Sequence, residues 1–197
     1  MKHLILALML VAMPASGATP TDTTVAFYHG APDRAGNYIV PGLDWQSAGA
    51  VRGDQSFDGH VEGHIYAQPL YWRPPGSESG LIIAATESDF VYALDAATGR
   101  VMWRTALGRA VPGAALPCGN IDPLGVTGTP VIDAARGTVY LDAMIDDRGT
   151  RGTSSTACGL PTAACRPTSR STLPRGSRRA ASGSTRWCKT NAGRWHC

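Results

Sequence analysis

The chain has 197 residues, of which 43% are hydrophobic, with 23 Gly and 14 Pro. This composition suits one or two folded domains and excludes collagen, coiled coils and acidic disordered proteins. Residues 1–150 carry 9 Lys and Arg and all 15 Asp and Glu, a net charge of −6, whereas residues 151–197 carry 9 basic residues and no acid, a net charge of +9. The formal net charge of +3 therefore describes neither part, and we expect no nucleic-acid partner.

The N-terminus has the pattern of a secretory signal. Lys2 precedes nine apolar residues, Leu4–Ala12, and small residues follow up to Ala18. Because nine apolar residues are roughly half of what a membrane span needs, the pattern favours a cleaved signal over an anchor. It predicts a signal peptide over 1–18, an N-terminal extension over 19–56, a secreted or periplasmic location, and no membrane span after cleavage.

The middle of the chain, residues 57–150, has the pattern of short antiparallel strands. Apolar residues there alternate with polar ones or form runs of four to seven, separated by Gly, Pro, Asp and Ser. No window of this region keeps a helical period over three turns. The pattern predicts strands at His64–Tyr71, Gly80–Thr86, Phe90–Asp95, Val101–Thr105, Thr129–Asp133 and Thr138–Ala143.

Two successive hairpins stand out within this region. A polar turn at Glu87–Asp89 joins the second and third predicted strands. The next reversal starts at Asp95, whose side chain can accept hydrogen bonds from the turn, and ends at Gly99, which can adopt a positive φ. Three linked strands that end near Trp103 form a meander.

The second reversal carries a specific resemblance. Residues 93–103 read ALDAATGRVMW and fit the pattern A-x-D-x-x-T-G-[KR]-x-x-W, which resembles the blade signature of the quinoprotein-like (PQQ-repeat) β-propellers. His64–Leu70 and Gly125–Asp133 are similar to the starts of innermost strands in that family. The resemblance extends from about Tyr28 to Asp146 and implies a secreted bacterial member with an all-β fold. That fold would be a partial propeller, quinoprotein alcohol dehydrogenase-like with four-stranded blades, one full and one partial.

The resemblance also implies roles for individual residues. In this family the motif tryptophan docks across the interface between blades, onto backbone near a glycine turn, so Trp103 is expected to join neighbouring blades. Ligands of such propellers bind in the central funnel. The implied structural motif comprises Ala93, Asp95, Thr98, Gly99 and Trp103, and the residues expected to line the funnel are His64, Gln68, Thr127 and Thr129.

No catalytic constellation is recognisable. The PQQ dehydrogenases of the resembled family use two adjacent cysteines, a calcium site and an aspartate base, and none of these positions carries over to this chain. His60 and His64 are four residues apart, but no third ligand is evident. We therefore predict no catalytic residue and no metal ligand. Cofactor-binding residues stay unknown, and PQQ with calcium is implied by the resemblance alone.

The composition changes abruptly after Thr150. Residues 151–197 contain no Val, Ile, Met, Phe or Tyr, so we expect a disordered basic tail. Its basic residues could contact nucleic acid or an anionic surface. Alternatively, the tail could be the translation of a wrong reading frame in a GC-rich gene. A third interpretation is a disulfide module built from Cys158, Cys165, Cys188 and Cys197.

The out-of-frame interpretation of the tail is favoured. Codons for Cys and Trp both begin with TG, so a frame that starts at the preceding base encodes Leu, Met or Val at those positions. With GC-rich codons, that frame permits a repeat across Gly152–Cys165 that parallels Phe90–Val101. The tail cysteines would then be accidental and Cys118 the only native thiol. The nucleotide sequence through codons 140–200 tests this hypothesis.

These observations combine into one functional expectation. The chain is interpreted as a truncated, secreted, PQQ-binding-like propeller that acts as a scaffold without demonstrable catalysis. Its partner would be a small molecule or a protein at the funnel. The alternative is a fragment of a PQQ-dependent dehydrogenase, an oxidoreductase. One full and one partial blade are too few to close a ring, which would leave sheet edges exposed.

Overall fold

The computed structural model describes residues 24–40 and 42–173. The predicted signal peptide, residues 1–18, and the tail from 174 onward lie outside the described residues. Helical structure within the described ranges is limited to the 3-10 turns η1 (Tyr28–Gly30) and η2 (Gly113–Ala115) and the four-residue helix α1 (Trp45–Ala48). None of these helices is long and apolar enough to cross a membrane.

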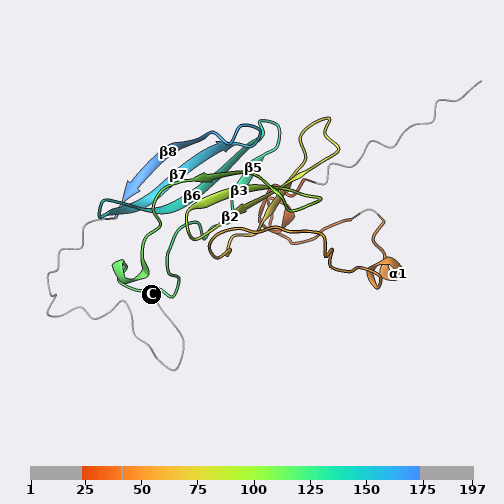
Figure 1. Ribbon diagram of the computed structural model, residues 1–197, viewed down its shortest axis with the longest axis horizontal. Coiled ribbons are helices and arrows are strands. Elements are labelled where there is room, and N and C mark those ends of the chain that lie inside the picture. Colours follow the sequence, from red (N-terminus) through yellow and green to blue (C-terminus); the bar gives the residue numbers. More distant parts are fainter. Residues whose placement is uncertain (1–23, 41, 174–197) are drawn as a thin grey trace, which may run out of the picture.

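Two four-stranded antiparallel sheets make up the fold, and they lie against each other (Figure 1). In each sheet every strand pairs with its neighbour in sequence, in the order β1-β2-β3-β4 and β5-β6-β7-β8. This meander follows from the short reversals between strands. The strands are β1 (Leu70–Trp72), β2 (Leu81–Ala85), β3 (Phe90–Asp95), β4 (Val101–Ala106), β5 (Val131–Asp133), β6 (Thr138–Asp147), β7 (Thr150–Gly159) and β8 (Cys165–Thr172).

A strand lies at each of the six positions predicted in the middle region, but the bounds of three differ by more than one residue: β1 and β5 start late, and β6 runs on to Asp147, four residues beyond the predicted end. The prediction for β3 matches its bounds, whereas β1 and β5 begin later than expected, at Leu70 and Val131. Each follows a proline, Pro69 or Pro130. Because proline has no N–H to donate, the regular strand pairing starts after it.

The expectation of a disordered tail is wrong for residues 151–172. β7 and β8 complete the second sheet, so it has four strands instead of the half blade expected. β7 pairs with β6 along its whole length. Its inward-facing residues are small, Gly152, Ser154, Thr156 and Cys158. Backbone pairing therefore holds this strand in place, while larger apolar side chains for the core come from other strands.

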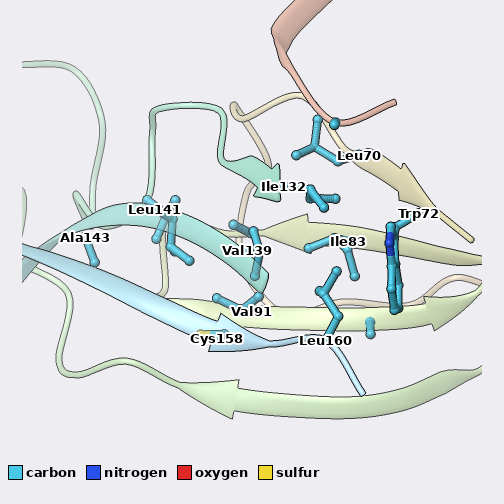
Figure 2. Packing of buried hydrophobic residues seen from close by; sticks show 14 of the residues in the cluster. Leu70, Trp72, Ile83, Val91, Ile132, Val139, Leu141, Ala143, Cys158 and Leu160 are labelled. Atoms are coloured by element: carbon cyan, nitrogen blue, oxygen red, sulfur yellow. The ribbon is translucent and has the colours of Figure 1, made fainter. Parts of the chain in front are cut away.

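One hydrophobic core is shared by the two sheets (Figure 2). Val91 on β3 and Val139 on β6 are both 0% exposed. A sheet has to bury its apolar face against another layer, so neither sheet is stable by itself. The buried side chains drawn between the sheets include Leu70, Trp72, Ile83, Ile132, Leu141 and Leu160.

Trp103 on β4 joins the two sheets. Its Nε1 donates a hydrogen bond of 2.8 Å to the carbonyl oxygen of Leu160, 57 residues away in the turn between β7 and β8. The half-buried indole also packs against the shared core. Thr105 adds a second link, since its Oγ1 donates to the carbonyl oxygen of Ala163 at 3.1 Å.

The Asp95–Gly99 reversal is held by its own side chains and by a packed neighbour. Asp95 Oδ1 accepts hydrogen bonds from the backbone of Ala97 and from both the backbone and the hydroxyl of Thr98. These bonds, foremost that from the Thr98 side chain, lower the pKa of Asp95. Gly99 has φ +78, and a Cβ there would come within 2.6 Å of the backbone of Asp58. The glycine is therefore required by both conformation and space.

Replacing Trp103 tests the link between the sheets. Trp103→Phe keeps a ring but removes the donor to Leu160, and it should lower the free energy of unfolding by about 1 kcal/mol. Trp103→Ala should cost about 3 kcal/mol because the ring is lost as well. Urea denaturation measures both values. The control is Trp45→Ala, since Trp45 is 97% exposed; an equal loss there would contradict the assignment.

Replacing Gly99 tests the reversal. Gly99→Ala should lower the free energy of unfolding by about 2 kcal/mol or more, because an L-residue is strained at this φ and its Cβ meets backbone. Gly128→Ala is the matched control, since nothing lies within 4 Å of a Cβ there. Its midpoint in urea should stay close to the parent's. Similar urea midpoints for the two variants would show that the conformation and close packing at Gly99 do not contribute to the stability of the fold.

Candidate functional site

Two loop segments that lead into β1 and β5 form the candidate site. We call them the approach segments, residues 64–69 and 125–130. They contact each other through a hydrogen bond of 2.9 Å from the backbone N–H of Gln68 to Oγ1 of Thr129, residues 61 apart in sequence. The structure thus brings two of the predicted funnel residues together.

The N-terminal extension reaches the same place. Gln68 Oε1 accepts a hydrogen bond of 3.0 Å from the backbone N–H of His29, and its Nε2 donates to the hydroxyl of Tyr38 at 3.3 Å. The rings of Tyr28 and His29 stack with centroids 3.9 Å apart. Gln68 is therefore held by three groups on two segments, the N-terminal extension and the second approach segment, and aromatic side chains lie beside it.

The other two predicted funnel residues meet at the turn between β2 and β3. The backbone N–H of Glu87 donates to the carbonyl oxygen of His64 at 2.9 Å. Glu87 Oε2 accepts hydrogen bonds from the N–H of Gly125 at 2.8 Å and from Oγ1 of Thr127 at 3.1 Å. Both approach segments are therefore anchored on one acidic turn, while the side chains of His64 and Thr127 stay exposed.

This acidic turn is buried. Thr86, Glu87 and Asp89 are at most 1% exposed, and four of their side-chain oxygens have no hydrogen-bond partner: Thr86 Oγ1, Glu87 Oε1 and both carboxylate oxygens of Asp89. Burial first, and the neighbouring Glu87 second, raise the pKa of Asp89 to about 7. A Cβ on Gly125 would lie 2.6 Å from Asp89 Oδ1, so only glycine lets the second approach segment cover the turn.

The sequence did not indicate that Glu87 and Asp89 are buried. Acidic residues in a hairpin turn are ordinarily solvated, and the residues that cover them lie about forty positions further along the chain. The one local signal is that two acidic residues, separated by Ser88, lie in a short turn between two hydrophobic strands. The predicted roles of His64, Gln68, Thr127 and Thr129 in lining a funnel stay a prediction.

A calcium–PQQ centre, which the resemblance implies, stays a prediction. Over residues 24–40 and 42–173, no three His, Cys, Asp or Glu side chains gather into a group that could hold a metal ion. His60 pairs with Asp58, and both side chains are largely exposed. No two cysteines are adjacent anywhere in the sequence. No reaction step is therefore assigned to that cofactor.

The fold and this site define an all-β protein made of two consecutive four-stranded meanders. No family model matches the chain, and no curated protein matches its sequence. Among solved structures it is similar to BamB from Moraxella catarrhalis, with 24% identity and a TM-score of 0.32 over 62% of this chain and 30% of that chain. The chain thus spans less than a third of that protein, and a likeness of this size assigns no family.

A pH series tests the burial of Asp89. Its folded pKa of about 7 lies above the ordinary value of 3.8, so the folded protein binds this proton more tightly and loses stability as pH rises from 3.8 to 7. Asp89→Asn cannot ionise and tolerates the positive φ at this position. Between pH 4 and pH 8 its free energy of unfolding should rise by about 1–3 kcal/mol relative to the parent.

The control for this series is an exposed aspartate with the opposite shift. The backbone N–H of Ser47 lowers the pKa of Asp44, so the stability that this carboxylate contributes is present at neutral pH and lost in acid. The free energy of unfolding of Asp44→Asn should therefore decrease relative to that of the parent as pH rises. Urea denaturation at each pH measures both variants, and a flat difference for Asp89→Asn would contradict its burial.

Proposed function

We propose that the chain is part of a β-propeller of the quinoprotein-like repeat class that works as a binding scaffold. Its two sheets are two neighbouring blades, and export, which residues 1–18 predict, belongs to this proposal. The repeat motif at Ala93–Trp103, the strand order of both sheets and the hydrogen bond from Trp103 to Leu160 support the assignment to blades. These features are the ones that the resemblance implies.

The observation that carries the binding role is the contact between Gln68 and Thr129. It holds the two approach segments side by side, so that their exposed side chains form one surface. That surface includes Ile65 at 41% and Tyr66 at 59% exposure, with Tyr38 at 51% beside Gln68. Tyrosine is enriched in protein interfaces because one rigid ring offers both apolar area and a hydroxyl. The proposed ligand is therefore a protein segment.

A rigid support suits this role. The approach segments are fixed at one end by the buried Glu87 and at the other by the strands β1 and β5. A surface that is already ordered loses less conformational entropy when a partner binds. The geometry thus favours recognition of a partner by a preformed patch.

Photo-crosslinking tests the proposal. A photoreactive phenylalanine analogue at position 66 should give a discrete adduct with one protein in the producing cell, identified by mass spectrometry. The same analogue at position 140 is the control, because Tyr140 is 43% exposed on β6, outside the approach segments. The purified partner should then bind Tyr66→Ala about tenfold more weakly than the parent.

Three outcomes would contradict the binding role. Position 140 could give the same adduct, position 66 could give none, or Tyr66→Ala could bind the partner as well as the parent does. Purified protein that binds PQQ in the presence of Ca²⁺ and reduces a dye with an alcohol or sugar would instead support the dehydrogenase alternative. Tyr140→Ala should leave the affinity unchanged.

A further inference from the structure

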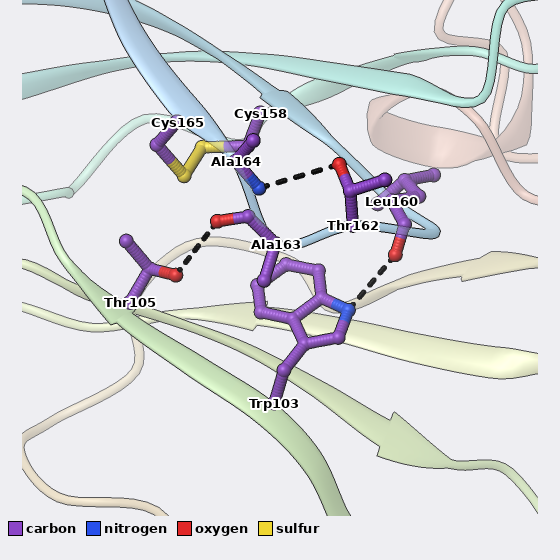
Figure 3. Close-up of a disulfide and its surroundings, with 8 residues drawn as sticks. All are labelled: Trp103, Thr105, Cys158, Leu160, Thr162, Ala163, Ala164 and Cys165. Atoms are coloured by element: carbon purple, nitrogen blue, oxygen red, sulfur yellow. Dashed lines mark hydrogen bonds between the residues drawn. A yellow bond between two sulfur atoms is a disulfide. The ribbon is translucent and has the colours of Figure 1, made fainter.

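The first sheet docks onto one turn of the second sheet. This turn, residues 160–164, joins β7 to β8, and we call it the docking turn (Figure 3). Trp103 donates to the carbonyl oxygen of Leu160, and Thr105 donates to that of Ala163. Both acceptors belong to the backbone, so the docking depends on the conformation of the turn and not on its side chains.

The docking turn repeats the backbone geometry of the Asp95–Gly99 reversal. Each turn is closed by the same three hydrogen bonds, although only one position, Thr98 and Thr162, has the same residue in both. In the first turn the backbone N–H groups of Asp95, Gly99 and Ala96 donate to the carbonyl oxygens of Arg100 (2.8 Å), Asp95 (2.8 Å) and Gly80 (3.0 Å). In the docking turn the equivalent N–H groups of Gly159, Ala163 and Leu160 donate to the carbonyl oxygens of Ala164 (3.0 Å), Gly159 (2.9 Å) and Gly137 (2.8 Å).

The carboxylate that anchors the first turn is missing from the second, although Thr162 keeps the hydrogen bond from the following backbone N–H that Thr98 accepts in the first. Asp95, which anchors the first turn with three hydrogen bonds, corresponds to Gly159, which has no side chain. Gly99 corresponds to Ala163, which adopts φ +57. An alanine is strained in this region, whereas a glycine is not. The docking turn thus needs another restraint.

A disulfide occupies the base of the docking turn. Cys158 and Cys165 pair across β7 and β8, at the positions that Leu94 and Val101 hold in the first sheet. Cys158 is 0% exposed in the shared core, whereas Cys165 is only partly buried, so Cys165 is the more accessible residue of the pair. The covalent bond joins the two strand ends from which the turn projects.

We propose that the Cys158–Cys165 disulfide is a redox-sensitive restraint that keeps the docking turn ready to accept Trp103. Reduction by a dithiol breaks the S–S bond in two steps: one reductant thiolate attacks the Cys165 sulfur, and Cys158 leaves as a thiolate. The second reductant thiolate then attacks the mixed disulfide, so that Cys165 also leaves as a thiolate and the reductant becomes a cyclic disulfide. Two electrons and two protons thereby pass to the two cysteines. The turn then keeps a strained alanine without an anchor, and the contact between the sheets loosens.

The experiment uses the full chain with Cys118, Cys188 and Cys197 replaced by serine, so that only this pair responds. Excess dithiothreitol should lower the urea midpoint by about 1 M. It should also shift the ¹⁹F resonance of 5-fluorotryptophan at position 103, which is assigned by its loss in Trp103→Phe. Mass spectrometry establishes the oxidation state of each sample. An unchanged midpoint and resonance after full reduction would overturn the proposal.

A rescue variant separates this restraint from a general effect of the disulfide. Gly159→Asp with Ala163→Gly gives the docking turn the two residues that hold the first turn, and its ¹⁹F resonance should no longer respond to dithiothreitol. Its urea midpoint should still fall, because the disulfide also restrains the unfolded chain. Cys158→Ala with Cys165→Val should resemble the reduced parent in either buffer. If reduction shifts the ¹⁹F resonance of the rescue variant as much as that of the parent, the disulfide does not act through the turn.

Discussion

The hydrogen bond from Trp103 to the carbonyl oxygen of Leu160 is the contact on which the arrangement of the two sheets depends. It joins β4, the last strand of the first sheet, to the turn between the last two strands of the second. The shared core supplies most of the burial, but apolar packing alone has no fixed direction. A donor on a rigid ring and an acceptor on a closed turn give the interface its register.

The second junction is polar and lies around the turn between β2 and β3. Glu87 receives two hydrogen bonds from the second approach segment, while Asp89 beside it receives none on its side chain. A buried carboxylate without donors is costly unless it is protonated, which is why its pKa rises. The two junctions therefore respond to different conditions, one to oxidation state and the other to pH.

The candidate site depends on these junctions because neither approach segment is part of a regular strand. Gln68 and Thr129 are placed by the sheets behind them, and Glu87 fixes the segment that contains Thr127. Loops on a rigid scaffold are a common location for binding residues, since the scaffold carries the stability and the loop side chains are free to vary.

Local signals in the sequence predicted β2, β3, β4 and the Asp95–Gly99 reversal, because alternation, turn residues and a repeat motif are read over a few neighbouring residues. The sequence also predicted a disordered tail, which is wrong for β7 and β8. Three features became visible in the folded chain alone: strand pairing with β6 orders these small polar residues, Glu87 and Asp89 are buried, and Cys158 meets Cys165. Each of these depends on groups distant in the sequence or on backbone pairing, which composition does not record.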